Sequence, residues 1–544
     1  MKSIFRILPL LALALVTMST VTEDNGKYFE ISKNIEIFTN LYKEINTSYV
    51  DDLDPAKLMR TGIDAMLESL DPYTNYISET EIEGFRYITD GKYNGIGALI
   101  RKMDDYVTIT EPYADCPAAK AGLKAGDIIL AVDGKSAKGK SSDDVSNILK
   151  GFPGTNVVLT IQRPGEAKEM EVTMTRDEVV VPNVPYSGLI SEDVGYIALT
   201  TFTRNAGKNV GDALRKLKEQ QPDLKGVIFD LRGNGGGLLT EAVNVSNVFI
   251  PKGELVVTTK GKVKDWDRSF KTLNKPVDEN IPLVVLVDKG SASASEIVSG
   301  VLQDLDRGVL IGQRSYGKGL VQNTRDVGYN SKVKMTTAKY YIPSGRCIQG
   351  VNYEDGIPID IPDSLRTAFT TRNGRKVLDG GGVSPDVKLA KFSDLSIIKG
   401  LRGEHLIFDY ATEYCLKNES IAAAEEFNFD DFDGFVKFVA AKSFEYDTDT
   451  EKALKKLRSE AKDEAFLAEI DAELAAIQKK ILERKENDLQ QYRTEITNLI
   501  EKEIASRYYY QQGKIEVGLK NDPEIAEAVR LFDNPAEYQK VLEN

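Results

Sequence analysis

The chain has 544 residues, of which 41% are hydrophobic and 28% are charged, a composition typical of a globular protein with sizeable cores. Its length exceeds that of one ordinary domain and suggests about three or four domains. The formal net charge of −14 argues against nucleic acid or an anionic membrane surface as the main partner.

The N-terminus has the pattern of an export signal. Lys2 and Arg6 are basic, and residues 7–16 form an apolar core that is short for a membrane-spanning helix. Residues 17–21 match a cleavage site only moderately, so residues 1–22 are interpreted as a signal peptide or as a retained N-terminal anchor. We therefore expect an exported protein of the periplasm or cell envelope. The sequence leaves open whether an uncleaved N-terminal segment tethers it.

Residues 23–90 are expected to form an N-terminal helical domain. Apolar positions recur at helical spacing, and residues 71–76 (Asp-Pro-Tyr-Thr-Asn-Tyr) interrupt this pattern as a turn. The sequence leaves open whether the segment is a small helical cap or a dimerisation element. The apolar positions are Ile35, Ile37, Leu41, Ile45, Leu58, Ile63, Met66 and Leu70.

Residues 91–178 change character and are expected to form a domain of short strands. Two helical segments, 117–129 and 143–149, lie among the strand-like runs. These runs cover residues 97–100, 107–110, 128–132, 157–161 and 170–174.

Two glycine-containing stretches of this region, residues 93–98 (Tyr-Asn-Gly-Ile-Gly-Ala) and 121–134, resemble parts of a PDZ domain. In such domains the amides of a glycine-rich loop bind a peptide carboxylate, and the next strand edge pairs with the peptide. The resemblance implies that the peptide-carboxylate site consists of Gly95, Ile96, Gly97 and Ala98.

Residues 179–394 are expected to form an α/β catalytic body. Continuous apolar runs of the kind found in buried strands alternate with helical patterns. The apolar runs cover residues 194–199, 226–230 and 283–287, and the helical patterns cover residues 206–219 and 238–248.

Residues 395–544 are expected to form a charged, helical C-terminal domain. A heptad-like stripe in this region covers barely two heptads, so we favour packing against the protein's own body over a coiled-coil dimer. The stripe consists of Leu467, Ile470, Leu474, Ile477 and Ile481.

The clearest chemical motif is the serine cluster at residues 291–296 (Ser-Ala-Ser-Ala-Ser-Glu), between a buried strand and a helical pattern. A serine hydroxyl needs a base before it can act as a nucleophile, and the only histidine, His405, lies far downstream. Lys318, between two glycines, is the better candidate, provided that burial lowers its pKa by about three units. Gln322 is a neutral polar group suited to orienting the lysine. The pattern predicts a serine–lysine hydrolase.

Cysteine and histidine give no sign of a metal centre. Cys116, Cys347 and Cys415 are widely spaced and form neither a disulfide framework nor a zinc pattern. The sequence leaves open whether two of them form one disulfide. His405 is interpreted as a structural or surface residue. We expect no metal and no cofactor.

A glycine cluster at residues 232–237 (Arg-Gly-Asn-Gly-Gly-Gly) follows another buried strand and offers accessible amides to a developing negative charge. Taken alone, a serine cluster before a helix is usually an N-cap, and a glycine run is usually a tight turn. Their combination with the lysine, the PDZ-like region and the export signal is far more specific.

Together with residues 70–76, 315–322, 340–346 and 380–386, these motifs make the chain closely similar to the carboxy-terminal processing peptidases, also called tail-specific proteases. The resemblance implies a multidomain α+β protein with a ClpP/crotonase-like serine-protease core. One departure is Lys150, where the family often has arginine. The resemblance therefore does not imply that the PDZ domain signals to the active site through this position.

The resemblance also implies the roles of individual residues. The nucleophile is the middle serine of the cluster, which lies 25 residues before the lysine, and Ser291 and Ser295 are structural, with Ser295 helping to cap the helix. Either glycine of the loop pairs with the next amide of the cluster as the oxyanion hole. The site then comprises Ser293, Lys318 and Gln322, with Gly235 or Gly236 and Ala294 as oxyanion donors.

The mechanism implied by the resemblance is acyl transfer through an acyl-enzyme. The expected substrates are exported proteins that are trimmed or degraded from apolar or unstructured C-termini recognised by the PDZ domain. An adaptor protein and a homodimer are left open as further partners, and no nucleic acid is expected.

Two rival functions are weaker. Residues 312–319 satisfy most of a nucleotide-binding P-loop, but Gly319 stands where Ser or Thr should bind magnesium. A catalytically inactive PDZ scaffold that binds protein C-termini is the main alternative, and the intact Ser293, Lys318 and Gln322 argue against it.

Overall fold

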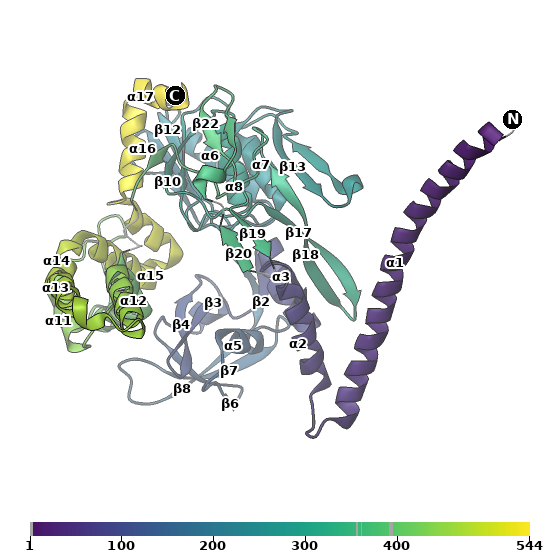
Figure 1. The fold of residues 1–544 in the computed structure, drawn as a ribbon. Helices are drawn as coiled ribbons and strands as arrows, with labels where there is room; N and C mark the ends of the chain where they lie inside the picture. Colours follow the sequence, from purple (N-terminus) through teal and green to yellow (C-terminus); the bar gives the residue numbers. More distant parts are fainter. Residues whose placement is uncertain (1–3, 355–356, 361, 391–394, 544) are drawn as a thin grey trace. The chain divides into compact units, whose positions relative to one another are not determined.

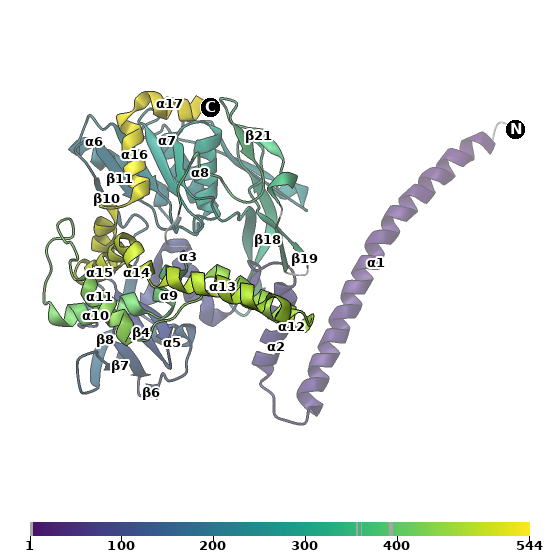
Figure 2. The same ribbon diagram turned by 60° about the vertical axis from the view of Figure 1, so that its left-hand side comes forward.

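The computed structural model describes residues 4–354, 357–360, 362–390 and 395–543, drawn as a ribbon in Figure 1 and, turned, in Figure 2. The chain divides into two compact units: residues 1–76 with 353–357, and the remainder. Lys2 of the expected export signal lies outside the described residues. In the described part of the chain, no helix combines the length and apolar character needed to cross a membrane.

The first unit contains the helices α1 (Ile4–Ser48) and α2 (Pro55–Glu68), which confirms the helical pattern expected there. Asp54 caps α2, because its Oδ1 accepts hydrogen bonds from the amides of Ala56 and Lys57 at 2.9 and 3.1 Å. The expected turn begins at Asp71, whose Oδ1 accepts from the amide of Tyr73 at 2.8 Å. The strand β1 (Asn75–Ile77) takes up the end of that segment.

The PDZ-like region is a sheet of the order β3-β4-β5-β7-β8, in which β6 also pairs with β5 and a separate pair is formed by β2 and β9. All five expected strands are present. The first expected helix is much shorter than predicted, because α4 makes one turn and residues 128 and 129 belong to a strand whose Ile129 is fully buried in the domain core. The elements are α3 (Ile82–Asp90), β2 (Lys92–Gly95), β3 (Ala98–Met103), β4 (Tyr106–Pro112), α4 (Pro117–Lys120), β5 (Ile128–Val132), β6 (Lys135–Ser136), α5 (Ser142–Leu149), β7 (Asn156–Gln162), β8 (Met170–Thr175) and β9 (Asp177–Val180).

The catalytic body is built on a sheet of the order β10-β11-β12-β15-β16-β23, parallel except for β10. The apolar runs expected to be strands are β11, β12 and β15, and every residue of these three strands is buried. The elements of this layer are β10 (Tyr186–Leu189), β11 (Val194–Ala198), α6 (Ala206–Gln220), β12 (Gly226–Asp230), α7 (Leu239–Phe249), β15 (Leu283–Val287), α8 (Ala294–Asp304), β16 (Val309–Gly312) and β23 (Val387–Lys388).

Both faces of this sheet are covered, because successive residues of a strand point to opposite sides. Phe229 and Val285 pack on one face with α6, α7 and α8. Ile228 and Val284 pack on the other face against α16 and α17 at the C-terminus of the chain, which lie beside the sheet in Figures 1 and 2. The last two helices therefore belong to the same layered structure as the catalytic strands.

An antiparallel sheet and several short elements make up the remaining described elements before residue 395. In that sheet β13 pairs with β14 and β18, and β18 pairs with β17. The elements are η1 (Glu79–Glu81), β13 (Leu255–Gly261), η2 (Lys264–Trp266), β14 (Arg268–Lys271), β17 (Leu320–Gly328), β18 (Ser331–Tyr341), β19 (Val351–Glu354), β20 (Ile357–Asp360), η3 (Asp363–Leu365), β21 (Ala368–Thr370) and β22 (Lys376–Leu378).

The C-terminal region is helical, as expected, and has its own core. In the heptad-like stripe, Leu474 is buried where α13 lies beside α12, whereas Ile477 keeps 44% of its surface exposed. The helices are α9 (Ser396–Gly403), α10 (Leu406–Lys417), α11 (Phe432–Ala441), α12 (Asp449–Asp463), α13 (Leu467–Lys485), α14 (Asp488–Gln491), α15 (Arg493–Leu519, interrupted at Tyr510), α16 (Pro523–Asp533) and α17 (Pro535–Glu543).

Candidate active site

The serine cluster forms a tight connection, the serine turn (residues 288–293), between β15 and α8. Asp288 Oδ1 accepts hydrogen bonds from the amides of Gly290 and Ser291 at 2.9 and 3.1 Å. Ser293 is the N-cap residue of α8, with φ 56° and ψ −110°. Such backbone conformations cost a non-glycine residue on the order of 1–3 kcal/mol and are concentrated at active sites. Ser293 is half-buried between two buried alanines, so the turn singles out its side chain.

The flanking serines hold the serine turn against the glycine loop (residues 231–237). Ser291 and Ser295 are fully buried, and each hydroxyl donates a 2.8 Å hydrogen bond to a carbonyl of that loop, those of Leu231 and Asn234. Both are structural, but the expectation that Ser295 caps the helix is wrong. Ser293 holds the N-cap position, and the Ser295 hydroxyl is engaged by Asn234.

Glu296, which the sequence reasoning passed over, joins the serine turn to the lysine loop (residues 312–318). Its Oε2 accepts hydrogen bonds from the amides of Ser293 and Lys318, both at 2.8 Å. Its Oε1 accepts from the hydroxyl of Ser315 and the amide of Gly317, both at 2.6 Å. Burial raises the pKa of Glu296, although these hydrogen bonds act to lower it. The spacing of Ser293 and Glu296, three residues apart at a helix start, was a signal that could have found this role.

Tyr340 of β18 holds the main chains of the nucleophile and base candidates. Its hydroxyl lies 2.6 Å from the carbonyl oxygen of Lys318 and 3.1 Å from that of Ser293. Gln322, on β17, donates from its Nε2 to the hydroxyl of Thr336 on β18 at 3.1 Å. The lysine and the glutamine therefore stand on a braced segment of the chain.

The glycine loop is packed directly against the serine turn. A Cβ on Gly236 would lie 2.7 Å from the carbonyl oxygen of Ala292 and 2.9 Å from the amide nitrogen of Ala294. The amide of Gly236 donates to Asn234 Oδ1 at 2.9 Å. Gly235 faces open space, and its amide donates no hydrogen bond to any described residue.

All the residues predicted for the catalytic centre line one pocket of about 460 Å³. The pocket brings together segments from the ends of β12 and β15 and from the start of β17. Its walls include Ser293, Ala294, Lys318, Gln322, Gly235 and Gly236. His405 is the N-cap residue of α10 and does not line this pocket.

Three of the four residues predicted for peptide binding, Gly95, Ile96 and Ala98, line a second pocket, of about 260 Å³, in the PDZ-like region. Gly97 is not among the lining residues, and its carbonyl accepts a 2.9 Å hydrogen bond from the amide of Tyr113. Lys150 also lines the pocket.

Three family models match the chain: peptidase family S41 over residues 193–362, a PDZ domain over residues 108–163, and the probable PDZ-protease C-terminal helical domain over residues 397–532. A carboxy-terminal-processing protease of Bartonella bacilliformis is 36% identical over 355 residues, which are 65% of this chain and 81% of that protein. A probable CtpA-like serine protease of Staphylococcus aureus is 32% identical over 462 residues, which are 82% of this chain and 91% of that protein.

The chain belongs to peptidase family S41. Among solved structures, the photosystem II D1 C-terminal processing protease is 29% identical and covers 65% of this chain and 92% of its own, with a TM-score of 0.36. This S41 chain is a serine peptidase that carries a PDZ domain and a C-terminal helical domain.

We expect Gly236→Ala to inactivate this S41 peptidase by about 100-fold, the scale of loss when reacting groups are misplaced by about 1 Å. The new Cβ would collide with the serine turn, and φ at Gly236 is +99°. Gly253→Ala is the matched control, because Gly253 has φ +93° and nothing within 4 Å of the added Cβ. Peptide hydrolysis rates and melting temperatures of both variants check this. Equal losses in the two variants would show that backbone strain, and not the collision, is responsible.

Proposed function

We propose that this S41 peptidase cleaves proteins in their C-terminal region through an acyl-enzyme on Ser293, with Lys318 as the base. The observation that supports this most is the single pocket lined by Ser293, Lys318, Gln322 and the glycine loop. The names of the relatives, a carboxy-terminal-processing protease and a CtpA-like serine protease, support the substrate class.

The proposed reaction has two acyl-transfer steps. Neutral Lys318 takes the proton of the Ser293 hydroxyl while the oxygen attacks the scissile carbonyl carbon. The tetrahedral intermediate collapses, the amine leaves with the proton from Lys318, and an ester remains on Ser293. Water then gives a proton to Lys318 and attacks the ester. As the second intermediate collapses, Lys318 returns this proton to the Ser293 oxygen, and the new C-terminus leaves.

For the oxyanion hole we propose the amides of Ala294 and Gly235. Ala294 directly follows the nucleophile at the start of α8, where the helix dipole favours negative charge. Of the two candidate glycines, Gly236 already uses its amide to hold Asn234. The Gly235 amide is therefore the one left to bind the developing charge.

For Gln322 we propose the role of orienting Lys318. Its amide nitrogen donates to the hydroxyl of Thr336, which fixes the orientation of the amide group. The amide oxygen is then left to accept a hydrogen bond from the amino group of Lys318. A neutral acceptor holds the lysine without stabilising its charged form as a carboxylate would.

The PDZ pocket is proposed to receive the apolar or unstructured C-terminus of the substrate through Gly95, Ile96, Gly97 and Ala98. We further propose an exported protein with an N-terminal signal or anchor (1–22), a helical domain (23–90), the PDZ domain (91–178), the peptidase core (179–394) and the C-terminal domain (395–544). An adaptor and a homodimer remain candidate partners.

The decisive test is cleavage of one unfolded protein carrying either an apolar or a doubly charged C-terminus, with products read by mass spectrometry. The apolar version should be cut faster. Gly97→Ala, whose Cβ would lie 2.3 Å from Cys116 Cβ, should remove this preference, while Gly122→Ala, with a similar φ and open space, should keep it. Labelling by a serine-directed fluorophosphonate separates the peptidase from the alternative, an inactive scaffold, which would bind C-terminal peptides without being labelled.

A further inference from the structure

Three loops meet at the candidate active site, and buried carboxylates join them in pairs. Asp288 of the serine turn accepts a 2.8 Å hydrogen bond from the amide of Gly233 in the glycine loop. Glu296 joins the serine turn to the lysine loop. The third pair, the glycine loop and the lysine loop, is joined by a residue from the far end of the chain, Glu524.

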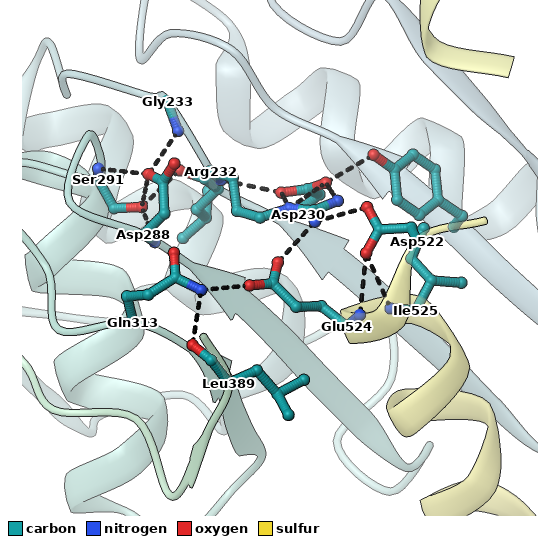
Figure 3. Close-up of polar contacts among 12 residues, drawn as sticks. Asp230, Arg232, Gly233, Asp288, Ser291, Gln313, Leu389, Asp522, Glu524 and Ile525 are labelled. Atoms are coloured by element: carbon teal, nitrogen blue, oxygen red, sulfur yellow. Dashed lines mark hydrogen bonds and ion pairs between the residues drawn. The ribbon is translucent and has the colours of Figure 1, made fainter. Parts of the chain in front are cut away.

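Glu524 lies in the first turn of α16 and is 7% exposed (Figure 3). Its Oε2 lies 2.6 Å from Nη1 of Arg232 in the glycine loop. Its Oε1 accepts a hydrogen bond from Nε2 of Gln313 in the lysine loop. Each oxygen of this one carboxylate therefore serves a different loop.

Arg232 is itself held from two sides. Its Nε and Nη2 donate to Asp230 at the end of β12, with distances of 2.6 to 3.0 Å. Its Nη1 also donates to Asp522, the N-cap residue of α16, at 2.7 Å. Planar guanidinium groups suit such multiple carboxylate contacts and lose little freedom in making them. The base of the glycine loop is thus fixed to both the sheet and α16.

The helix that carries Glu524 is firmly anchored. Ile525 and Phe532 of α16 are buried against the sheet, and a Cβ on Gly226 of β12 would meet the Phe532 ring at 2.4 Å. After the next turn, the hydroxyl of Tyr538 accepts from the amide of Leu283 at 2.9 Å and donates to its carbonyl at 3.0 Å. Glu524 therefore presents its two oxygens from a rigid platform.

We infer that Glu524 is a positioning residue for catalysis, by which the C-terminal helix α16 sets the spacing between the glycine loop and the lysine loop. The inference rests on the proposed serine–lysine function and adds a role for the C-terminal region in that chemistry. The oxyanion amide and Lys318 stand on these two loops, so their separation decides whether both reach one substrate carbonyl.

Glu524→Gln tests this with a minimal change. A carboxylate has two acceptor oxygens, whereas an amide has one, so the variant cannot accept hydrogen bonds from both Arg232 and Gln313. We expect kcat to fall about 100-fold, with KM for a C-terminal peptide substrate unchanged. Glu527→Gln, on the same helix and, among the described residues, paired only with Arg530, is the matched control and should keep full kcat.

Gln313→Leu breaks the same link from the other side and should lower kcat similarly. The double variant should be no slower than the slower single one, because either change already opens the link. Equal kcat in Glu524→Gln and Glu527→Gln would overturn the inference. If Glu524→Gln does not fold, Gln313→Leu decides, and its full kcat would overturn the inference too. Fluorophosphonate labelling of the wild type, absent in Ser293→Ala, establishes the underlying chemistry separately, so that failure of the proposed function is recognised at that step.

Discussion

Ser293→Ala is expected to abolish peptide hydrolysis, with a loss in kcat/KM of at least about 1000-fold, as in other serine peptidases that lose their nucleophile. Alanine keeps the Cβ and meets the same left-handed backbone at φ 56°, so the fold should be unaffected. Lys318→Ala should be as damaging, because it removes the group proposed to take the serine proton. Lys318→Arg keeps the charge but cannot accept the proton, since arginine stays protonated in proteins, and should be equally inactive.

Initial rates on an unfolded protein and fluorophosphonate labelling measure both losses, with melting temperatures and binding of a C-terminal peptide as controls for folding. The pH profile adds a further check. Activity that depends on neutral lysine should rise with pH, as the amino group loses its proton. Retained cleavage by Ser293→Ala would overturn the nucleophile, and an unchanged pH profile in Lys318→Ala would overturn the base.

Glu296→Gln is expected to cost at least about 100-fold in kcat, because it loosens Ser293 and Lys318 together. Three of the four donors around the carboxylate are backbone amides, those of Ser293, Gly317 and Lys318. The glutamine amide group would face donors with a donor, and a buried amide left without an acceptor costs roughly 1–3 kcal/mol. The melting temperature should therefore fall as well. Glu219→Gln, exposed on α6, is the control and should change neither quantity.

Acidic pH should lower the activity of the wild type, as Glu296→Gln does, but it should not lower the contribution of Glu296 to stability. Burial raises the pKa of Glu296, so its carboxylate takes up a proton at a higher pH than an exposed glutamate, and activity should fall there. A group whose pKa is raised by folding contributes most to stability below its unfolded pKa, and that contribution is lost as pH rises through the folded pKa. The wild type should thus lose activity on mild acidification while the contribution of Glu296 to stability increases. A wild type and Glu296→Gln with parallel stability–pH curves would contradict this.

Local patterns in the sequence predicted many of the helices and strands. Apolar runs predicted β11, β12 and β15, and helical periodicity predicted α6 and α7. Both kinds of element can be predicted locally, because the spacing of apolar residues along a short segment indicates a buried strand or an amphipathic helix. The same patterns misjudged α4. Residues 128 and 129 suit a helix as well as a strand, and only pairing with β4 and β7 decides between them.

The candidate site divides in the same way. By itself the sequence determined the residues that line the catalytic pocket, because its motifs end strands of one parallel sheet and such ends gather at one edge. Only the tertiary structure decided how the loops are held together. Arg232 and Glu524 are 292 residues apart in sequence, and no periodicity or spacing relates them. Their contact exists because α16 packs across the sheet and brings a carboxylate to the loops that carry the chemistry.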